Sequence, residues 1–182
     1  MDSTQEFETT IIKYFKEIIS DFNLEWKYGP SGKHDEIQLY NEKCMVRFIY
    51  DKGLVLCDFI SPEEKLRRES VIRKDGFPSG FPVYSAYSVW KFLYPHDKIN
   101  YNYIGWDIDE QVLAYKNILL ERLTNVLRGD FSWAGDYKTN DNRISKKLEY
   151  MMTHWESDHP IRIKFKEGNS DWERDFDNLI KP

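Results

Sequence analysis

The sequence predicts an α+β fold, in which an antiparallel β-meander of four to five strands packs against an N-terminal helix and a long amphipathic helix. Three patterns lead to this prediction: apolar residues at helical spacing near the N-terminus, alternating apolar residues in the stretches that follow, and a second, longer helical pattern in the later half. No internal repeat or shift of composition marks a second domain. We therefore expect one domain over residues 1–182, with an irregular segment at about residues 64–82.

The N-terminal helix is expected at residues 4–22. Ser3 and Glu6 have the spacing of a capping box, in which each side chain accepts a hydrogen bond from a backbone N–H near the start of the helix. The apolar residues that follow recur every three or four positions and would form one buried face: Phe7, Ile11, Ile12, Phe15, Ile18, Ile19 and Phe22.

Four short apolar stretches separated by turn residues predict antiparallel strands at residues 24–28, 37–40, 44–50 and 54–60. The last two stretches are joined by Asp51, Lys52 and Gly53. Glycine tolerates the positive φ that tight hairpin turns require. Consecutive strands with such short connections predict a meander.

The remaining elements are expected to be mostly helical. A short helix is predicted at residues 83–94, and a long one from the capping box of Asp107 and Glu110 to Arg128 and Gly129. Further helices are expected at residues 142–155 and, capped by Ser170, at residues 171–180. Alternation in residues 161–165 predicts one more strand, and the acidic residues between 167 and 177 are expected to form a solvated helix face.

Composition narrows the class of protein. Hydrophobic residues make up 41% of the chain and charged residues 31%, with 16% aromatic residues, which is a globular composition. The polar, acidic N-terminus and the absence of a long apolar run predict a cytoplasmic protein that does not associate with membranes. Cys44 and Cys57 lie in apolar strands and are expected to be buried thiols. The net charge of −5 disfavours tight unspecific binding to nucleic acid.

No cluster of residues has the spacing of a known catalytic site, so we expect neither a catalytic residue nor a cofactor. His154 and His159, with Glu156 and Asp158 between them, are the nearest approach to a metal site. Their spacing of five does not match the three or four residues that bring two histidines to one side of a helix. A metal-dependent enzyme stays open as an alternative.

Aromatic and acidic residues gather on both sides of the long helix. Tyr and Trp are enriched at protein interfaces, and carboxylates beside them suit a basic partner. Because a domain with six tryptophans must bury most of them, core packing is the competing interpretation. The predicted partner-binding residues are Tyr101, Tyr103, Trp106, Asp107, Asp109, Trp133, Asp136 and Tyr137.

A basic segment supplies an alternative function. Positive residues beside aromatic ones are typical of grooves that bind single-stranded nucleic acid. A solvated basic turn is the simpler interpretation. The residues concerned are Lys65, Arg67, Arg68, Arg73 and Lys74.

The layout resembles the immunity-like proteins of bacterial toxin–immunity systems. The resemblance covers about half the chain and rests on the N-terminal helix, the hairpin Met45–Val55 and the helix end Leu127–Trp133. It implies a small cytosolic α+β protein that binds and blocks a toxin without catalysing a reaction. No functional residue can be carried over from a defined motif. The sequence thus favours a non-enzymatic protein that inhibits or sequesters a protein partner, with a nucleic-acid-binding regulator as the alternative.

Overall fold

The computed structural model describes residues 3–29, 35–63, 84–97, 105–169 and 171–180. Contacts within the chain form two compact units, Met1–Phe131 and Ser132–Pro182, which we call unit 1 and unit 2. Compact units need not fold independently. The expectation of one domain over residues 1–182 therefore stays a prediction.

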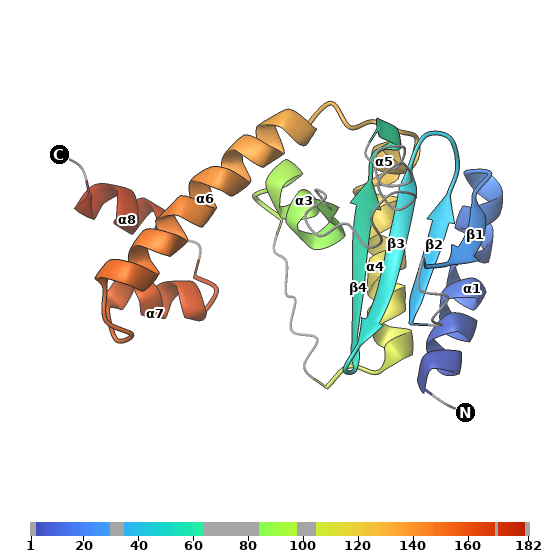
Figure 1. Cartoon of the computed structure of the whole chain (residues 1–182), viewed down its shortest axis with the longest axis horizontal. Helices are drawn as coiled ribbons and strands as arrows, with labels where there is room; N and C mark the ends of the chain where they lie inside the picture. Colours follow the sequence, from blue (N-terminus) through green and yellow to red (C-terminus); the bar gives the residue numbers. More distant parts are fainter. Residues whose placement is uncertain (1–2, 30–34, 64–83, 98–104, 170, 181–182) are drawn as a thin grey trace, which may run out of the picture. The chain divides into compact units, whose positions relative to one another are not determined.

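Unit 1 is built on an antiparallel sheet with the strand order β1-β2-β3-β4-β5 (Figure 1). Every strand pairs with its neighbours in sequence, which confirms the predicted meander. Lys52 and Gly53 form the β3–β4 turn with φ of 51° and 87°. The strands are β1 (Glu25–Tyr28), β2 (Glu36–Tyr40), β3 (Met45–Asp51), β4 (Leu54–Ile60) and β5 (Tyr84–Ser85).

Two long helices, α1 (Ser3–Asp21) and α4 (Ile108–Glu121), contact each other and cover the same face of this sheet. The ring of Phe48 in β3 shows this, because it meets Phe15 of α1 at 4.8 Å and Tyr115 of α4 at 6.4 Å between centroids. Phe7 and Phe59 are also fully buried in this core. The predicted α+β architecture is confirmed.

Two predicted helices of unit 1 differ in detail. The short helix α3 (Ala86–Leu93) is preceded by the two-residue strand β5, where the sequence predicted a helix from residue 83. The long helix ends at Glu121 and is followed by α5 (Thr124–Leu127). The hydroxyl of Thr124 donates to the carbonyl oxygen of Leu120 at 2.6 Å and so satisfies the end of α4.

Unit 2 consists of α6 (Ala134–His154), α7 (Pro160–Lys166) and α8 (Trp172–Leu179). A small core of Met151, Ile161, Trp172 and Phe176 holds these helices together. Helix α6 begins eight residues before the predicted start at residue 142, because its first turns are polar and carry no apolar spacing. Ser170, the predicted cap of the last helix, lies outside the described residues.

The predicted strand at residues 161–165 is wrong, because this segment is helix α7. His159 caps it by accepting a hydrogen bond from the backbone N–H of Ile161, and Pro160 occupies the first turn, where a proline costs no hydrogen bond. Of the alternating apolar residues only Ile161 is buried, whereas Ile163 and Phe165 are exposed. Local capping therefore outweighs the alternating pattern.

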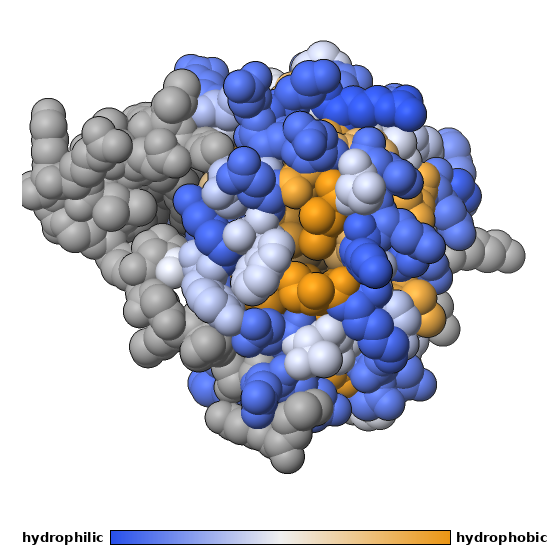
Figure 2. Space-filling view, turned by 90° about the vertical axis from the view of Figure 1, so that its right-hand side faces the viewer, coloured by the Kyte–Doolittle hydropathy of each residue, from blue (hydrophilic) through white to orange (hydrophobic). Residues whose placement is uncertain are grey.

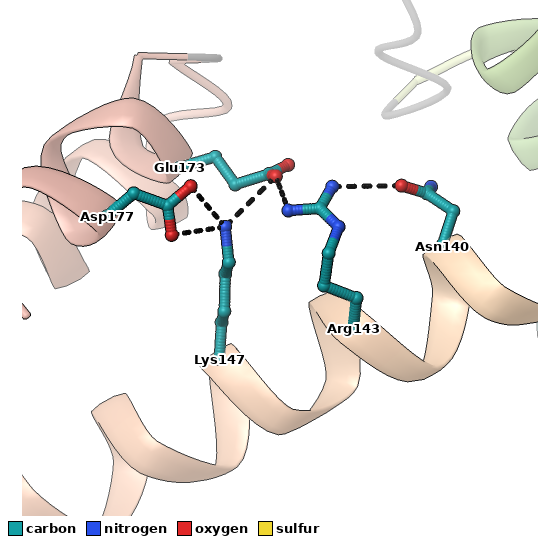
Figure 3. Close-up of polar contacts among 5 residues, drawn as sticks. All are labelled: Asn140, Arg143, Lys147, Glu173 and Asp177. Atoms are coloured by element: carbon teal, nitrogen blue, oxygen red, sulfur yellow. Dashed lines mark hydrogen bonds and ion pairs between the residues drawn. The ribbon is translucent and has the colours of Figure 1, made fainter. Parts of the chain in front are cut away.

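The acidic residues of the C-terminal stretch form the predicted solvated face only in part, because Glu167, Asp171 and Asp177 are exposed whereas Glu173 and Asp175 are partly buried. Lys147 of α6 is buried and lies 3.2 Å from Glu173 and 2.7 Å from Asp177 of α8 (Figure 3). Arg143 also pairs with Glu173, and Asp175 pairs with Lys164 of α7. These ion pairs fasten α8 to the other two helices. No helix in the described part of the chain has the length and apolarity to cross a membrane.

Candidate protein-binding face

The structure divides the residues predicted for partner binding between the two units. Trp106, Asp107 and Asp109 lie at the start of α4 in unit 1. Trp133, Asp136 and Tyr137 lie at the start of α6 in unit 2, where Trp133 is buried and meets the ring of Tyr137 edge-on at 5.8 Å. Tyr101 and Tyr103 lie outside the described residues.

The carboxylates at the start of α4 have structural roles. Asp107 accepts a hydrogen bond from the backbone N–H of Glu110 at 2.8 Å, and Glu110 accepts one from the N–H of Asp107 at 2.9 Å, which confirms the predicted capping box. Asp109 pairs with Lys13 of α1 at 3.1 Å, and hydrogen bonds from Tyr14 and Lys13 lower its pKa. The capping box and the Asp109–Lys13 ion pair therefore fix the position of α4.

Gln111 holds Trp106 beside the β3–β4 hairpin. Its buried side-chain amide donates to the carbonyl oxygens of Gly53 at 2.9 Å and of Trp106 at 3.1 Å, and its oxygen accepts from the N–H of Val55 at 2.8 Å. One side chain thus satisfies three backbone groups of two segments. The backbone of Trp106 is positioned by the core of unit 1, while its side chain remains 38% exposed.

Two exposed apolar side chains lie on the outer side of α4, and the exposed Trp106 precedes the start of this helix. Leu113 and Leu120 are 40% and 41% exposed. They stand seven residues apart, which is about two helical turns, and so point to the same side of the helix. We call Trp106, Leu113 and Leu120 the α4 stripe. Sequence reasoning selected only Trp106, although a helical projection places both leucines outside the buried face of α4.

Charged residues border the α4 stripe. Glu110 and Glu121 of α4 are exposed. Glu17 of α1 pairs with Lys116 at 3.3 Å, and the side chain of Glu17 is 81% exposed. The stripe therefore presents an apolar centre whose border carries these three acidic residues and Lys116, a helix neighbour of both leucines.

A pocket of about 760 Å³ opens at the end of the α4 stripe. Leu120 belongs to both, and Phe22 and Leu127 supply further apolar surface. The acidic side chains of Asp21, Glu25 and Glu42 line the pocket together with Lys43 and Arg128.

Asn41 shapes this pocket. Its side-chain nitrogen donates to the carbonyl oxygen of Phe22 at 2.9 Å, which ties the β2–β3 turn to the end of α1. Its side-chain oxygen accepts from the backbone N–H groups of Lys43 at 2.7 Å and Cys44 at 2.9 Å. The pocket wall is therefore a hydrogen-bonded turn that is positioned without a ligand.

The other sites predicted from the sequence are the metal-site candidate at His154 and His159 and the basic segment. His154 stacks on Tyr150 at 4.2 Å, and His159 stacks on Trp155 at 4.1 Å and caps α7. The described residues contain no group of His, Cys, Asp and Glu side chains placed to hold a metal ion. The basic segment Lys65, Arg67, Arg68, Arg73 and Lys74 lies outside the described residues.

Comparison with known proteins does not assign a family to this chain, because no family model, curated protein or solved structure matches it.

Proposed function

We propose that this protein is a non-enzymatic inhibitor that binds and sequesters a protein partner, in the manner of the immunity proteins of toxin–immunity systems. The observation that carries the proposal is the α4 stripe, in which Leu113 and Leu120 are exposed on one side of α4, Trp106 is exposed just before its start, and Leu120 also lines a pocket. Single exposed apolar residues are normal, whereas a row that leads into a pocket is typical of an interface.

The charges around the stripe indicate the kind of partner. Glu17, Glu110 and Glu121 border it together with one basic residue, Lys116, and three of the five charged side chains of the pocket are acidic. A partner with an apolar centre and a basic border complements this surface. Many toxins that act on nucleic acid need basic surfaces for phosphate contacts, and an acidic inhibitor would cover such a surface.

Affinity capture with matched variants tests the proposal. The tagged protein is incubated with nuclease-treated lysate of its source, and bound proteins are identified by mass spectrometry. Leu113→Asp and Leu120→Asp should each lose the partner, because a buried unpaired carboxylate opposes association. Leu54→Asp is the control, since Leu54 is also exposed, at 47%, but lies on the opposite face of the sheet from the helices.

The captured partner must then be inhibited by the wild-type protein and not by the two α4 variants. Equal capture by all variants would contradict the role of the α4 stripe. Recovery of nucleic acid that disappears as salt rises would support the nucleic-acid-binding alternative instead.

A further inference from the structure

Strand β1 is an edge strand of the sheet, and its outer edge faces away from β2. In the described residues its only strand partner is β2, with Trp26 opposite Leu39 and Lys27 opposite Gln38. The N–H of Gly29 donates to the carbonyl oxygen of Glu36 at 2.9 Å. Backbone groups alternate in direction along an antiparallel strand, so those of Lys27 also face β2 and those of Trp26 face outward.

The side chains beside this edge form an apolar surface. Trp26 is 42% exposed on the helix-covered side of the sheet. The hydroxyl of Tyr28 donates to Glu8 of α1 at 2.5 Å, which places that side of α1 next to β1. Ile12 and Ile19 follow Glu8 at helical spacing and are partly exposed. Figure 2 shows an apolar patch on the face of unit 1 where these two elements lie.

The other side of β1 carries two opposite charges. Glu25 accepts a hydrogen bond from the hydroxyl of Tyr40 at 2.9 Å, and the ammonium group of Lys27 lies 4.7 Å from the centre of the same ring. Tyr40 therefore holds both side chains on one face, two residues apart. Charges on a short edge strand usually prevent indiscriminate pairing with other strands. In β1 the order of Glu25 and Lys27 allows the edge to pair with one particular strand.

We infer that the outer edge of β1 pairs with β1 of a second copy of this chain, antiparallel and centred on Trp26. This register places Glu25 of each copy opposite Lys27 of the other, so two ion pairs form about the symmetry axis. The two Trp26 residues form the hydrogen-bonded pair, because their backbone groups face outward. The Glu25–Lys27 pairs are then the non-hydrogen-bonded ones, whose Cα atoms lie roughly 4.5 Å apart with side chains in contact.

Charge complementarity selects this occupant and this register. Pairing shifted to place Glu25 opposite Glu25 or Lys27 opposite Lys27 brings like charges together, which destabilises cross-strand pairs. The segment Glu25–Trp26–Lys27 is thus complementary to itself only in the centred antiparallel arrangement. The inference concerns association of the chain with itself and does not rest on the proposed inhibitor function, although Glu25 also lines the pocket at the end of the α4 stripe.

Charge-reversal variants test the pairing by sedimentation equilibrium, in which the 21.9 kDa chain should reach twice its mass as concentration rises. Glu25→Lys and Lys27→Glu should each raise the dissociation constant of the dimer at least about tenfold, because both cross-strand pairs become repulsive. The double variant should restore the wild-type constant. A mixture of the two single variants should form a heterodimer more tightly than either variant forms a homodimer.

A backbone variant provides a second readout. Trp26→Pro removes an N–H that points away from β2, so it should abolish the dimer while circular dichroism shows the fold retained. Matching spectra for all variants establish that loss of association is not loss of structure. A monomer at every concentration, or a dimer that responds to neither charge reversal nor Trp26→Pro, would overturn the inference. Loss of partner capture without any change in dimerisation would concern the proposed function alone.

Discussion

The side-chain nitrogen Nε of Arg122 lies 2.7 Å from the carboxylate oxygen Oδ2 of Asp97. The same oxygen accepts a hydrogen bond from Nε1 of Trp90 at 2.8 Å. Asp97 therefore joins helix α3, which contains Trp90, to the residue that follows α4. Hydrogen bonds from Arg122 and Trp90 lower the pKa of Asp97 below its ordinary value of 3.8.

This pKa shift predicts how Asp97 affects stability at different pH values. Because the folded-state pKa is lowered, the ionised carboxylate stabilises the fold above about pH 3.8, and this contribution disappears as pH falls through the lowered folded pKa. Asp97→Asn should therefore reduce the free energy of unfolding at neutral pH and lose its effect in strong acid. Urea unfolding at several pH values measures the difference.

Asp141→Asn is the matched control, because it removes the same charge from an exposed position of α6. It should leave the unfolding transition nearly unchanged at neutral pH. An Asp97→Asn effect that persists unchanged in strong acid would show that packing, and not the ion pair, carries the contribution of Asp97.

The elements that the sequence predicted well have strong local signals. The capping box of Asp107 and Glu110 fixes the start of α4, and the turn at Lys52 and Gly53 fixes the register of the β3–β4 hairpin. In residues 161–165 two local signals conflict: the cap at His159 and Pro160 favours a helix, whereas the alternating apolar residues favour a strand. The alternation led to the wrong prediction, because Ile163 and Phe165 are exposed. Alternation predicts a strand only where a sheet buries one side of it.

The candidate site was harder to predict because exposure depends on tertiary structure. Trp106 and Trp133 have similar acidic surroundings in sequence, yet Trp106 is exposed and Trp133 is buried. The pocket is assembled from four segments between Asp21 and Arg128. Only a fold brings these segments together, so no spacing rule could have found it.

Lys147 is predicted to stabilise unit 2. Its ammonium group is buried between Glu173 and Asp177, and its removal leaves both carboxylates without their shared partner. Lys147→Ala should lower the free energy of unfolding by about 1–2 kcal/mol. The loss is below that of a fully buried pair because the side chains of Glu173 and Asp177 are 29% and 52% exposed.

Lys146→Ala is the control for Lys147→Ala, because the side chain of Lys146 is exposed at the preceding position of α6. Hydrogen exchange of the α8 amides reports the local effect: exchange should become faster in Lys147→Ala and stay unchanged in Lys146→Ala. Equal behaviour of the two variants would contradict the structural role of the ion pairs in Figure 3.

Gly129 is predicted to be required at the end of α5. Its φ is +92°, and the N–H groups of Gly129 and Asp130 donate to the carbonyl oxygens of Val126 and Asn125, the pattern of a Schellman motif. A Cβ atom at Gly129 would lie 2.9 Å from Cβ of Lys43. Gly129→Ala should therefore reduce stability by about 1–3 kcal/mol, measured by urea unfolding.

Gly53→Ala separates the two causes of this loss. Gly53 also has positive φ, +87°, but a Cβ atom there meets nothing within 4 Å. The smaller loss expected for Gly53→Ala measures the backbone conformation alone, and the excess in Gly129→Ala measures the contact with Lys43. A larger loss in Gly53→Ala would contradict the contribution of that contact.

Cys44 and Cys57 are predicted to be unreactive in the folded protein. Both are free thiols in the core, each 1% exposed, and Cys44 donates to the carbonyl oxygen of Leu127 at 3.4 Å. Burial raises the pKa of Cys57 well above its ordinary value, which suppresses the reactive thiolate. A thiol reagent such as a maleimide should therefore label neither cysteine until urea unfolds unit 1.

The added thiol of Ser20→Cys calibrates this measurement, because Ser20 is exposed on α1 and its replacement should react at once. The rate at which Cys44 and Cys57 are labelled below the unfolding transition then reports opening of the core. Because Cys57 lies opposite Phe48 in the centre of the sheet, whereas Cys44 begins the β3 side of a turn, Cys44 should be labelled first. Rapid labelling of Cys57 in the folded protein would contradict the packing of this sheet against α1 and α4.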